Sequence, residues 1–204
     1  MFSNNGLSIS SYDVPQPCDL ARAEGSNRLI LEELAYDKTA LCAEATSMAL
    51  ALNREQRGIY DIVVRSVCQR QSFVYFIAGH GGTGKTFLWR TILARLRSQD
   101  HIVLAVASSG VAALLMPGGR TAHSRFRIPL DIHDRSMCSI GRGTILAGLI
   151  QKTSLIIWDE APMAHRFCFE ALDRTLRDLL SADDPSNAAK PFGGMPVLLG
   201  GNFT

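Results

Sequence analysis

The stretch Gly79-His80-Gly81-Gly82-Thr83-Gly84-Lys85-Thr86 decides the fold, because it has the form G-x-x-x-x-G-K-T of a phosphate-binding loop. Its glycines let the backbone turn several N–H groups toward one anion, and the helix that follows directs further free N–H groups to the same place. In such a loop Lys85 reaches the β- and γ-phosphates, and the Thr86 hydroxyl holds Mg²⁺. We therefore predict that the whole loop binds a nucleoside triphosphate.

The segments on both sides of the loop agree with this prediction. Residues 73–78 form a continuous apolar run, which is typical of a buried strand. After the loop, Leu88, Ile92 and Leu96 recur at helical spacing. Strand, glycine loop and helix follow one another as the motif requires, so an ordinary glycine-rich turn is the weaker alternative.

Composition sets the broad class. The chain has 204 residues, enough for one substantial domain or a cramped two, and its 47% hydrophobic and 20% charged residues are typical of a soluble globular protein. Its five cysteines are scattered without a C-x-x-C pair, which argues against a zinc site or a disulfide framework and fits a reducing compartment. The chain shows no secretory signal, transit peptide or apolar run of membrane-spanning length, so we expect no membrane partner.

Charge is unevenly distributed. Residues 79–130 hold seven Lys or Arg against one acid, a net charge of +6, whereas the whole chain carries only +2. A basic segment beside a nucleotide site suits a polyanionic partner. For Arg90, Arg95 and Arg97 the favoured interpretation is a solvated helix face.

Strand and helix patterns alternate along the chain. Further apolar strands are predicted at residues 102–107, 154–158 and 196–199, with helices at 111–115, 145–151 and 167–180 between them. Before the loop, residues 27–36, 41–52 and 53–67 have helical character, and residues 1–26 form a loose lead-in. Residues 117–143 and 181–191 are predicted as loops. Alternation of this kind predicts an α/β fold, a parallel sheet with helices on both faces.

Candidate chemistry follows each predicted strand. Gly79, Ser108, Asp159 and Asn202 each come at or near the carboxyl end of one. Ligands of parallel α/β sheets bind at these ends. We therefore expect a single site there.

Two acids end the third of these strands, at Asp159 and Glu160. Phosphoryl transfer to water needs a metal held against the phosphates and a group that orients the water. Asp159 suits the hold on Mg²⁺, and Glu160 suits the water-activating base. The alternative for the pair alone is a solvated strand end. With the phosphate loop present, we predict Lys85, Asp159 and Glu160 as the catalytic residues, and Thr86 and Asp159 as the metal ligands.

Gln56 has two interpretations. Asn53 is a natural N-cap, and Gln56 stands three residues later, where a capping box places Glu or Gln. An amide just before a phosphate loop can also read the adenine edge, since it offers both a donor and an acceptor. Spacing alone favours the cap.

Three further motifs resemble the Pif family of DNA helicases, superfamily-one motors that move 5′→3′ on single-stranded DNA, and in particular its plant and Helitron-borne members. The resemblance covers the chain from about Leu52 onward and rests on several spaced motifs, which are Ala107-Ser108-Ser109-Gly110-Val111-Ala112-Ala113-Leu114-Leu115, Gly119-Arg120-Thr121-Ala122-His123-Ser124-Arg125-Phe126 and Trp158-Asp159-Glu160-Ala161-Pro162-Met163.

The resemblance implies a RecA-like ATP-binding fold and an adenine-reading role for Gln56, which reverses the preference from spacing. It implies that Ser108, Ser109 and Gly110, together with Thr121, His123 and Ser124, hold the phosphates of single-stranded DNA, and so position the strand without reading its sequence. Phe126 is expected either to stack on a base, which is worth about 1–3 kcal/mol, or to lie in the core.

The resemblance also sets the expected domain organisation: a partly helical lead-in at 1–51 and the first RecA-like motor domain at 52–204. The family continues its last strand into Gly-Asp-Phe-Arg-Gln, whereas this chain reads Gly200-Gly201-Asn202-Phe203-Thr204. The second motor domain, with an arginine finger worth about 10³–10⁵ in rate, is expected to be absent. Unwinding by these residues alone is expected to be weak or missing.

The implied function is an ATP-dependent DNA helicase acting in repair, recombination and telomere maintenance, with Mg²⁺ as cofactor and ATP and single-stranded DNA as partners. The expected compartment is the nucleus, with the mitochondrion as the alternative, and the expected state is a monomer. A truncated ATP- and DNA-binding relic without turnover is the alternative function. A P-loop ATPase of another kind is disfavoured by the segment from Thr121 to Ser124.

Overall fold

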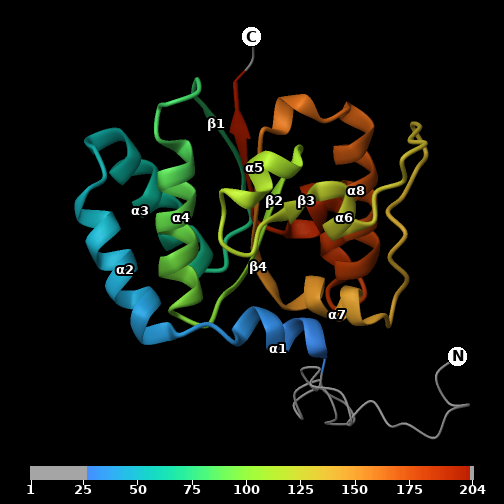
Figure 1. The fold of residues 1–204 in the computed structure, drawn as a ribbon. Helices are drawn as coiled ribbons and strands as arrows, with labels where there is room; N and C mark the ends of the chain where they lie inside the picture. The colour runs from blue at the N-terminus through green and yellow to red at the C-terminus, as the bar shows by residue number, and fades with distance from the viewer. Residues whose placement is uncertain (1–26, 203–204) are drawn as a thin grey trace, which may run out of the picture.

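The computed structural model describes residues 27–202, which form a five-stranded parallel sheet in the order β1-β5-β4-β2-β3. The predicted lead-in of residues 1–26, with Cys18, lies outside the described residues, as do Phe203 and Thr204. The parallel α/β fold and all four predicted strands are confirmed (Figure 1). The strands are β1 (Val74–Ala78), β2 (Ile102–Ala107), β3 (Arg120–Thr121), β4 (Thr153–Asp159) and β5 (Val197–Gly201).

The helices occur close to where sequence periodicity predicts them, apart from α6 and the short 3₁₀ turns in segments expected to be loop. They are α1 (Arg28–Leu34), α2 (Lys38–Leu50), α3 (Arg54–Cys68), α4 (Lys85–Arg97), α5 (Gly110–Leu114), α6 (Ala122–Phe126), α7 (Ile145–Lys152) and α8 (Arg166–Leu180), with 3₁₀ turns η4 (Ala161–Met163), η5 (Pro185–Ala189) and η6 (Pro191–Gly194).

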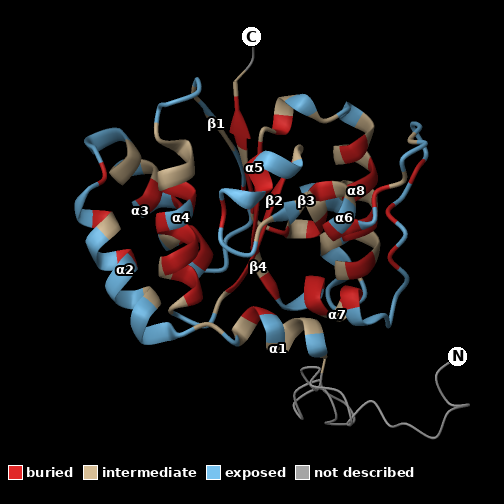
Figure 2. Ribbon diagram, in the orientation of Figure 1, coloured by how far each residue is buried: buried red, intermediate tan, exposed pale blue. Residues whose placement is uncertain are grey.

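The sheet separates two apolar cores, because successive side chains of a strand point to opposite faces. Along β2, Leu104 and Val106 join the core beneath α7 and α8, whereas Val103 and Ala105 join the core beneath α3 and α4. The most buried segments therefore lie in the sheet and on the inward sides of these helices (Figure 2).

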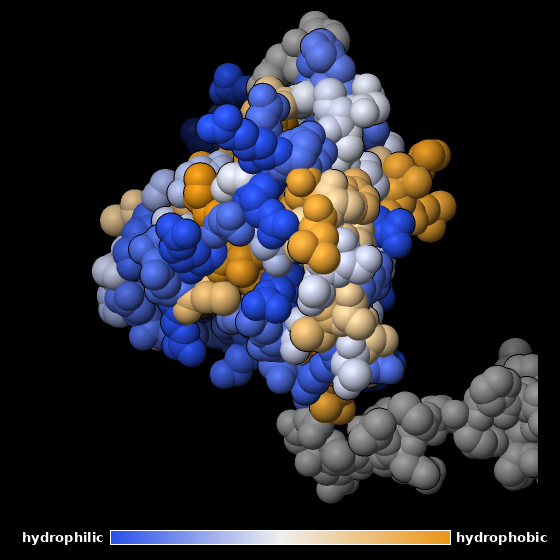
Figure 3. All heavy atoms as spheres, turned by 90° about the vertical axis from the view of Figure 1, so that its left-hand side faces the viewer, coloured by the Kyte–Doolittle hydropathy of each residue, from blue (hydrophilic) through white to orange (hydrophobic). Residues whose placement is uncertain are grey.

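The first strand differs from its prediction as a buried strand. β1 pairs only with β5 in the described part of the sheet, so it is an edge strand. Val74 is 42% exposed and Tyr75 is 38% exposed. An apolar run cannot by itself report edge position, because that is set by strand order. The side of the molecule that carries α2 and α3 is mostly hydrophilic, with separate apolar patches (Figure 3). Leu50 of α2 and Ile62 of α3 are exposed apolar side chains.

The segment expected to be loop at 117–143 contains β3 and α6. β3 has only two residues, Arg120 and Thr121, paired with Val106 and Ala107 of β2. Two residues are too few to form a periodic pattern, so β3 could not be predicted from the sequence. Its pairing fixes where α6 begins.

Arg97 was wrongly assigned to a solvated helix face. It is 4% exposed and donates hydrogen bonds to the carbonyls of Pro117 (2.7 Å) and Val103 (3.0 Å). Burial lowers the pKa of Arg97 from its usual value, and neighbouring Tyr36 and Glu33 oppose that shift. On the same helix Arg90 is exposed, as predicted.

Helices α1 and α2 precede the region that resembles the Pif family, which begins at about Leu52. They pack against the rest of the fold, α1 on α7 and α2 on α4. Within residues 27–202 no helix is both long and apolar enough to cross a membrane.

Candidate nucleotide site

The phosphate loop connects β1 to α4 at the carboxyl end of the sheet. Gly82 and Gly84 have φ of 83° and 81°, a left-handed backbone that favours glycine. Gly84 is the N-cap of α4 and supplies no side-chain cap, so the first N–H groups of the helix stay open toward the loop. This is the geometry that binds an anion.

Lys85 lies within this loop. Its Nζ donates hydrogen bonds to the carbonyl oxygens of Gly79 and His80, the second at 2.9 Å. An ammonium group has three donors, and both acceptors are neutral. Phosphate oxygens would compete well with them, because hydrogen bonds between charged groups are stronger.

Gln56 forms hydrogen bonds both within the cap of α3 and to the phosphate loop. The capping box is confirmed, since Gln56 N donates to Asn53 Oδ1 at 2.9 Å and Gln56 Oε1 accepts from Asn53 N at 3.2 Å. Its Nε2 also donates to the carbonyl of Thr83 in the phosphate loop at 3.2 Å. The amide therefore ties the start of α3 to the loop, and its adenine contact stays a prediction.

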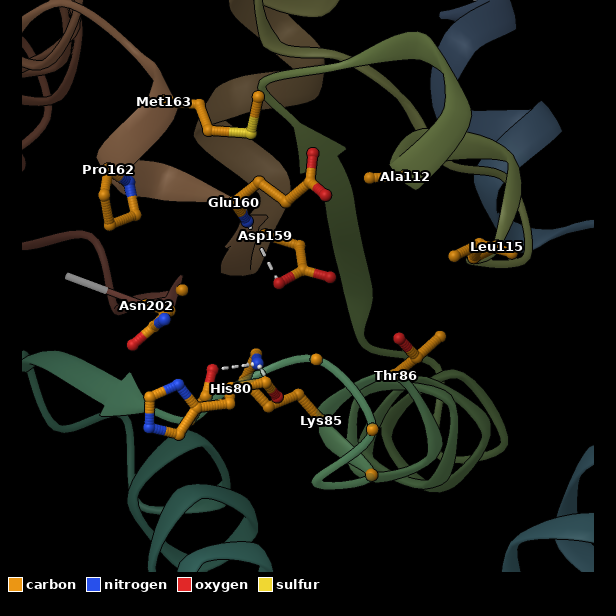
Figure 4. Close-up of a pocket in the computed structure, with 15 residues that line it drawn as sticks. His80, Lys85, Thr86, Ala112, Leu115, Asp159, Glu160, Pro162, Met163 and Asn202 are labelled. Carbon is orange, nitrogen blue, oxygen red and sulfur yellow. Dashed lines mark hydrogen bonds between the residues drawn. The ribbon is translucent and has the colours of Figure 1, made fainter. Parts of the chain in front are cut away.

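The two acids at the end of β4 face the loop across a cleft of about 500 Å³ (Figure 4). Asp159 is 6% exposed, and its Oδ1 accepts a hydrogen bond from Glu160 N at 3.0 Å. Glu160 has a left-handed backbone with φ of 52°, which turns the chain sharply into η4. The Thr86 hydroxyl and the Asp159 carboxylate line this same cleft, and such hard oxygen ligands suit Mg²⁺.

The convergence predicted for the strand ends is observed. Gly79 N donates to Gly201 O at 3.0 Å, and Ser108 N donates to Asp159 O at 3.2 Å, so neighbouring strands end side by side. Sequence reasoning missed several residues that close the cleft. Pro162 and Met163 lie two and three residues after Glu160, and that closeness in sequence is the signal that would have found them. Asn202, expected at the strand ends, does line the cleft, whereas the missed lining residues are Ala112, Leu115, Pro162, Met163 and Gly201.

The predicted DNA segment at 108–110 adjoins the cleft rather than lining it. Ser109 Oγ donates to Glu160 Oε2 at 2.6 Å, and Ser108 Oγ accepts from Trp158 Nε1 at 3.0 Å. Gly110 is exposed at the start of α5. The segment is thus tied to the strand that carries the acids.

The second predicted DNA segment follows β3. Thr121 caps α6 by accepting from Ser124 N at 3.4 Å, and Ser124 is exposed. His123 is half-buried, with Nε2 3.8 Å from Cys168 Sγ. Phe126 is fully buried beside Trp158, with ring centroids 6.3 Å apart, so the prediction that it stacks on DNA is wrong and the core alternative is correct.

A second cavity, of about 530 Å³, lies around the opposite ends of the strands. Arg70, His101, Lys152 and Lys190 line it, and none of the predicted site residues does. The pKa of His101 is lowered by burial and by Arg70.

A glycine loop at a helix N-terminus faces strand-end acids across a cleft at the carboxyl edge of a parallel sheet, and this arrangement defines a P-loop nucleotide-binding domain of the RecA-like type. The sequence model of the PIF1-like helicase family matches residues 51–204. The chain belongs to this family.

Relatives and solved structures agree with that assignment. The chain is 30% identical over 191 residues to the ATP-dependent DNA helicase PIF4 of Trypanosoma brucei, covering 91% of this chain but 22% of that protein. It is 32% identical to human ATP-dependent DNA helicase PIF1, covering 69% and 20%. It is similar in structure to Pif1 helicase from Bacteroides in complex with ADP-AlF3 and ssDNA, with a TM-score of 0.59 and 28% identity over 74% of this chain and 32% of that one.

Proposed function

We propose that these residues form the ATP-hydrolysing motor domain of a 5′→3′ DNA helicase that couples turnover to movement along single-stranded DNA. The observation that carries the proposal is the shared cleft of Lys85, Thr86, Asp159 and Glu160. Membership of the PIF1-like family supports it. The chain spans 22% of the length of one relative and 20% of another, so the activity of a whole helicase is part of the proposal.

Each residue of the cleft has a proposed role. The loop N–H groups and Lys85 bind the phosphates of ATP, while Thr86 and Asp159 hold Mg²⁺. When bound, Mg²⁺ neutralises charge on the β- and γ-phosphates. Glu160 orients the attacking water and accepts its proton. Gln56, which is held by its cap and by its hydrogen bond to Thr83, is proposed to contact the adenine edge.

Single-stranded DNA is proposed to cross the ends of β2 and β3. Ser108, Ser109 and Gly110 follow β2, and residues 121–124 begin with the last residue of β3, so the two segments are neighbours at the carboxyl edge of the sheet. Their hydroxyls, amides and His123 suit phosphate contacts. The Bacteroides Pif1 structure with ADP-AlF3 contains ssDNA, which supports this choice of partner.

On the resemblance alone, we extend the proposal to DNA repair, recombination and telomere maintenance in the nucleus, with the mitochondrion as the alternative compartment.

The test is ATP hydrolysis by the chain with and without an oligo-dT strand. Lys85→Ala should abolish turnover, because it removes the cation that meets the phosphates. Arg90→Ala is the matched control, since it removes an exposed cation of the same helix whose partner is Glu44 at 3.6 Å. Nucleotide binding without turnover, with or without DNA, would instead support an ATP- and DNA-binding module. Equal loss in both variants would contradict the proposed site.

A further inference from the structure

A hydrogen bond between side chains joins the two proposed sites. Ser109 belongs to the segment proposed to hold DNA, and Glu160 is the acid proposed to orient water. The Ser109 Oγ to Glu160 Oε2 distance is 2.6 Å, which is normal for a hydroxyl that donates to a carboxylate, and the charge on the carboxylate makes this hydrogen bond stronger than one between neutral groups.

The Ser109 hydroxyl has no donor to spare. A serine hydroxyl offers one proton and two acceptor sites. One acceptor site takes the hydrogen bond from Ala112 N at 3.2 Å and so caps α5. The single proton is committed to Glu160.

Glu160 is held on the α5 side of the cleft. Figure 4 shows its carboxylate directed toward Ala112, with the Asp159 carboxylate lying between it and Lys85. Its backbone is fixed by the hydrogen bond from Glu160 N to Asp159 Oδ1 and by the sharp turn into η4. Once the hydrogen bond from Ser109 is broken, the Glu160 carboxylate can therefore turn toward the proposed phosphate site by rotation of its side chain alone.

A DNA phosphate would break this hydrogen bond. A phosphate oxygen is an acceptor without a proton of its own, so it and Glu160 cannot both receive the one Ser109 proton. The phosphate charge would also repel the Glu160 carboxylate and drive it from the α5 side.

We propose that Ser109 is a positioning residue that holds Glu160 in a resting place and releases it when single-stranded DNA binds at 108–110. The inference deepens the proposed function and rests on it, because it needs DNA at this segment and Glu160 as the water-orienting acid. It explains how strand binding can be sensed at the nucleotide without any contact between the two ligands.

Turnover gives the first test. Ser109→Ala should raise DNA-free ATP hydrolysis about three- to tenfold and reduce the stimulation by oligo-dT, because loss of a hydrogen bond to a charged group is worth about that factor or more. Ser109→Thr keeps the hydroxyl and should restore the low DNA-free rate.

Thr144→Ala is the matched control. Thr144 caps α7 through Ala147 N at 3.2 Å, so the variant loses an equivalent cap away from the acids. It should leave both rates unchanged. A DNA-free rate that falls or stays constant in Ser109→Ala would overturn the inference.

DNA affinity gives a second test that needs no turnover. Without nucleotide, Glu160→Ala should tighten the Kd for fluorescein-labelled oligo-dT about three- to tenfold, because Ser109 no longer has to leave a carboxylate. In a Ser109→Ala background the same change should have little effect.

The possible outcomes are distinct. An equal gain in both backgrounds would mean general charge repulsion and would overturn the inference while leaving the proposed DNA site intact. Failure of every variant to bind oligo-dT would overturn DNA as the ligand of this segment, and with it that part of the proposed function.

Discussion

At the scale of single residues, Gln56 combines a structural and a proposed binding role in one side chain. Its Oε1 completes the capping box, whereas its Nε2 reaches the phosphate loop at Thr83. The sequence offered these as competing interpretations. The structure shows that the cap leaves the amide beside the loop, so the two roles are compatible.

Asn53→Ala and Gln56→Ala separate these roles. Both remove part of the capping box and should lower the free energy of unfolding by about 0.5–2 kcal/mol. Only Gln56→Ala should also weaken binding of an adenine nucleotide, measured by titration with a fluorescent ATP analogue. Equal nucleotide affinity in the two variants would restrict Gln56 to the cap.

Gly200 shows how tightly the cleft is built. A Cβ at Gly200 would collide with the Trp89 ring and lie 3.2 Å from Asp159 Oδ1. We expect Gly200→Ala to lower the free energy of unfolding by about 1–3 kcal/mol and to weaken nucleotide binding, because Asp159 must shift.

Gly58→Ala is the matched control for this substitution. A Cβ at Gly58, in helix α3, would have no neighbour within 4 Å. The variant should be more stable by about 0.5–1 kcal/mol, since alanine favours the helix. Urea unfolding measures both changes, and a stable Gly200→Ala with intact binding would contradict the expected collision.

At the scale of elements, a buried charge cluster connects α1 to α4 and α6. Glu33 lies 2.6 Å from Arg125 of α6 and 3.7 Å from Arg97 of α4, and all three side chains are less than a tenth exposed. Buried ions of this kind need their partners, because an unpaired charge stays desolvated. The cluster therefore connects α1, which precedes the matched family region, to the helix that carries His123.

Glu33→Ala should destabilise the protein by about 3–5 kcal/mol, because it leaves two buried guanidinium groups without their carboxylate. Glu32→Ala is the control, since Glu32 forms an exposed i,i+4 pair with Arg28. Its effect should stay within about 0.5 kcal/mol. Thermal unfolding compares the two, and equal effects would show that the cluster contributes no more than a surface pair.

At the scale of the whole molecule, one sheet supports two cores, and each core contains one of the two tryptophans of the chain. Trp89 lies in the core beneath α3 and α4, and Trp158 lies in the core beneath α7 and α8. Each strand contributes alternate residues to the two cores. Unfolding of the helices on one face should therefore disrupt the strands and expose the core on the other face.

The two cores should therefore unfold together. In Trp89→Phe the tryptophan fluorescence comes from Trp158 alone, and in Trp158→Phe it comes from Trp89 alone. Within each variant, the urea transitions by tryptophan fluorescence and by far-UV circular dichroism should coincide. Separate midpoints in either variant would show that the faces unfold independently.

The phosphate loop, the strand-end acids, the four main strands and the parallel α/β fold could all be predicted from the sequence. These features depend on local patterns: a motif read over eight positions, apolar runs, and helical spacing. The order of the strands in the sheet and the burial of particular side chains became known only from the tertiary structure. The edge position of β1, the two-residue β3, the burial of Phe126 and Arg97, and the hydrogen bond from Ser109 to Glu160 all depend on residues distant in sequence. Long-range pairing selects them, and no local pattern encodes that pairing.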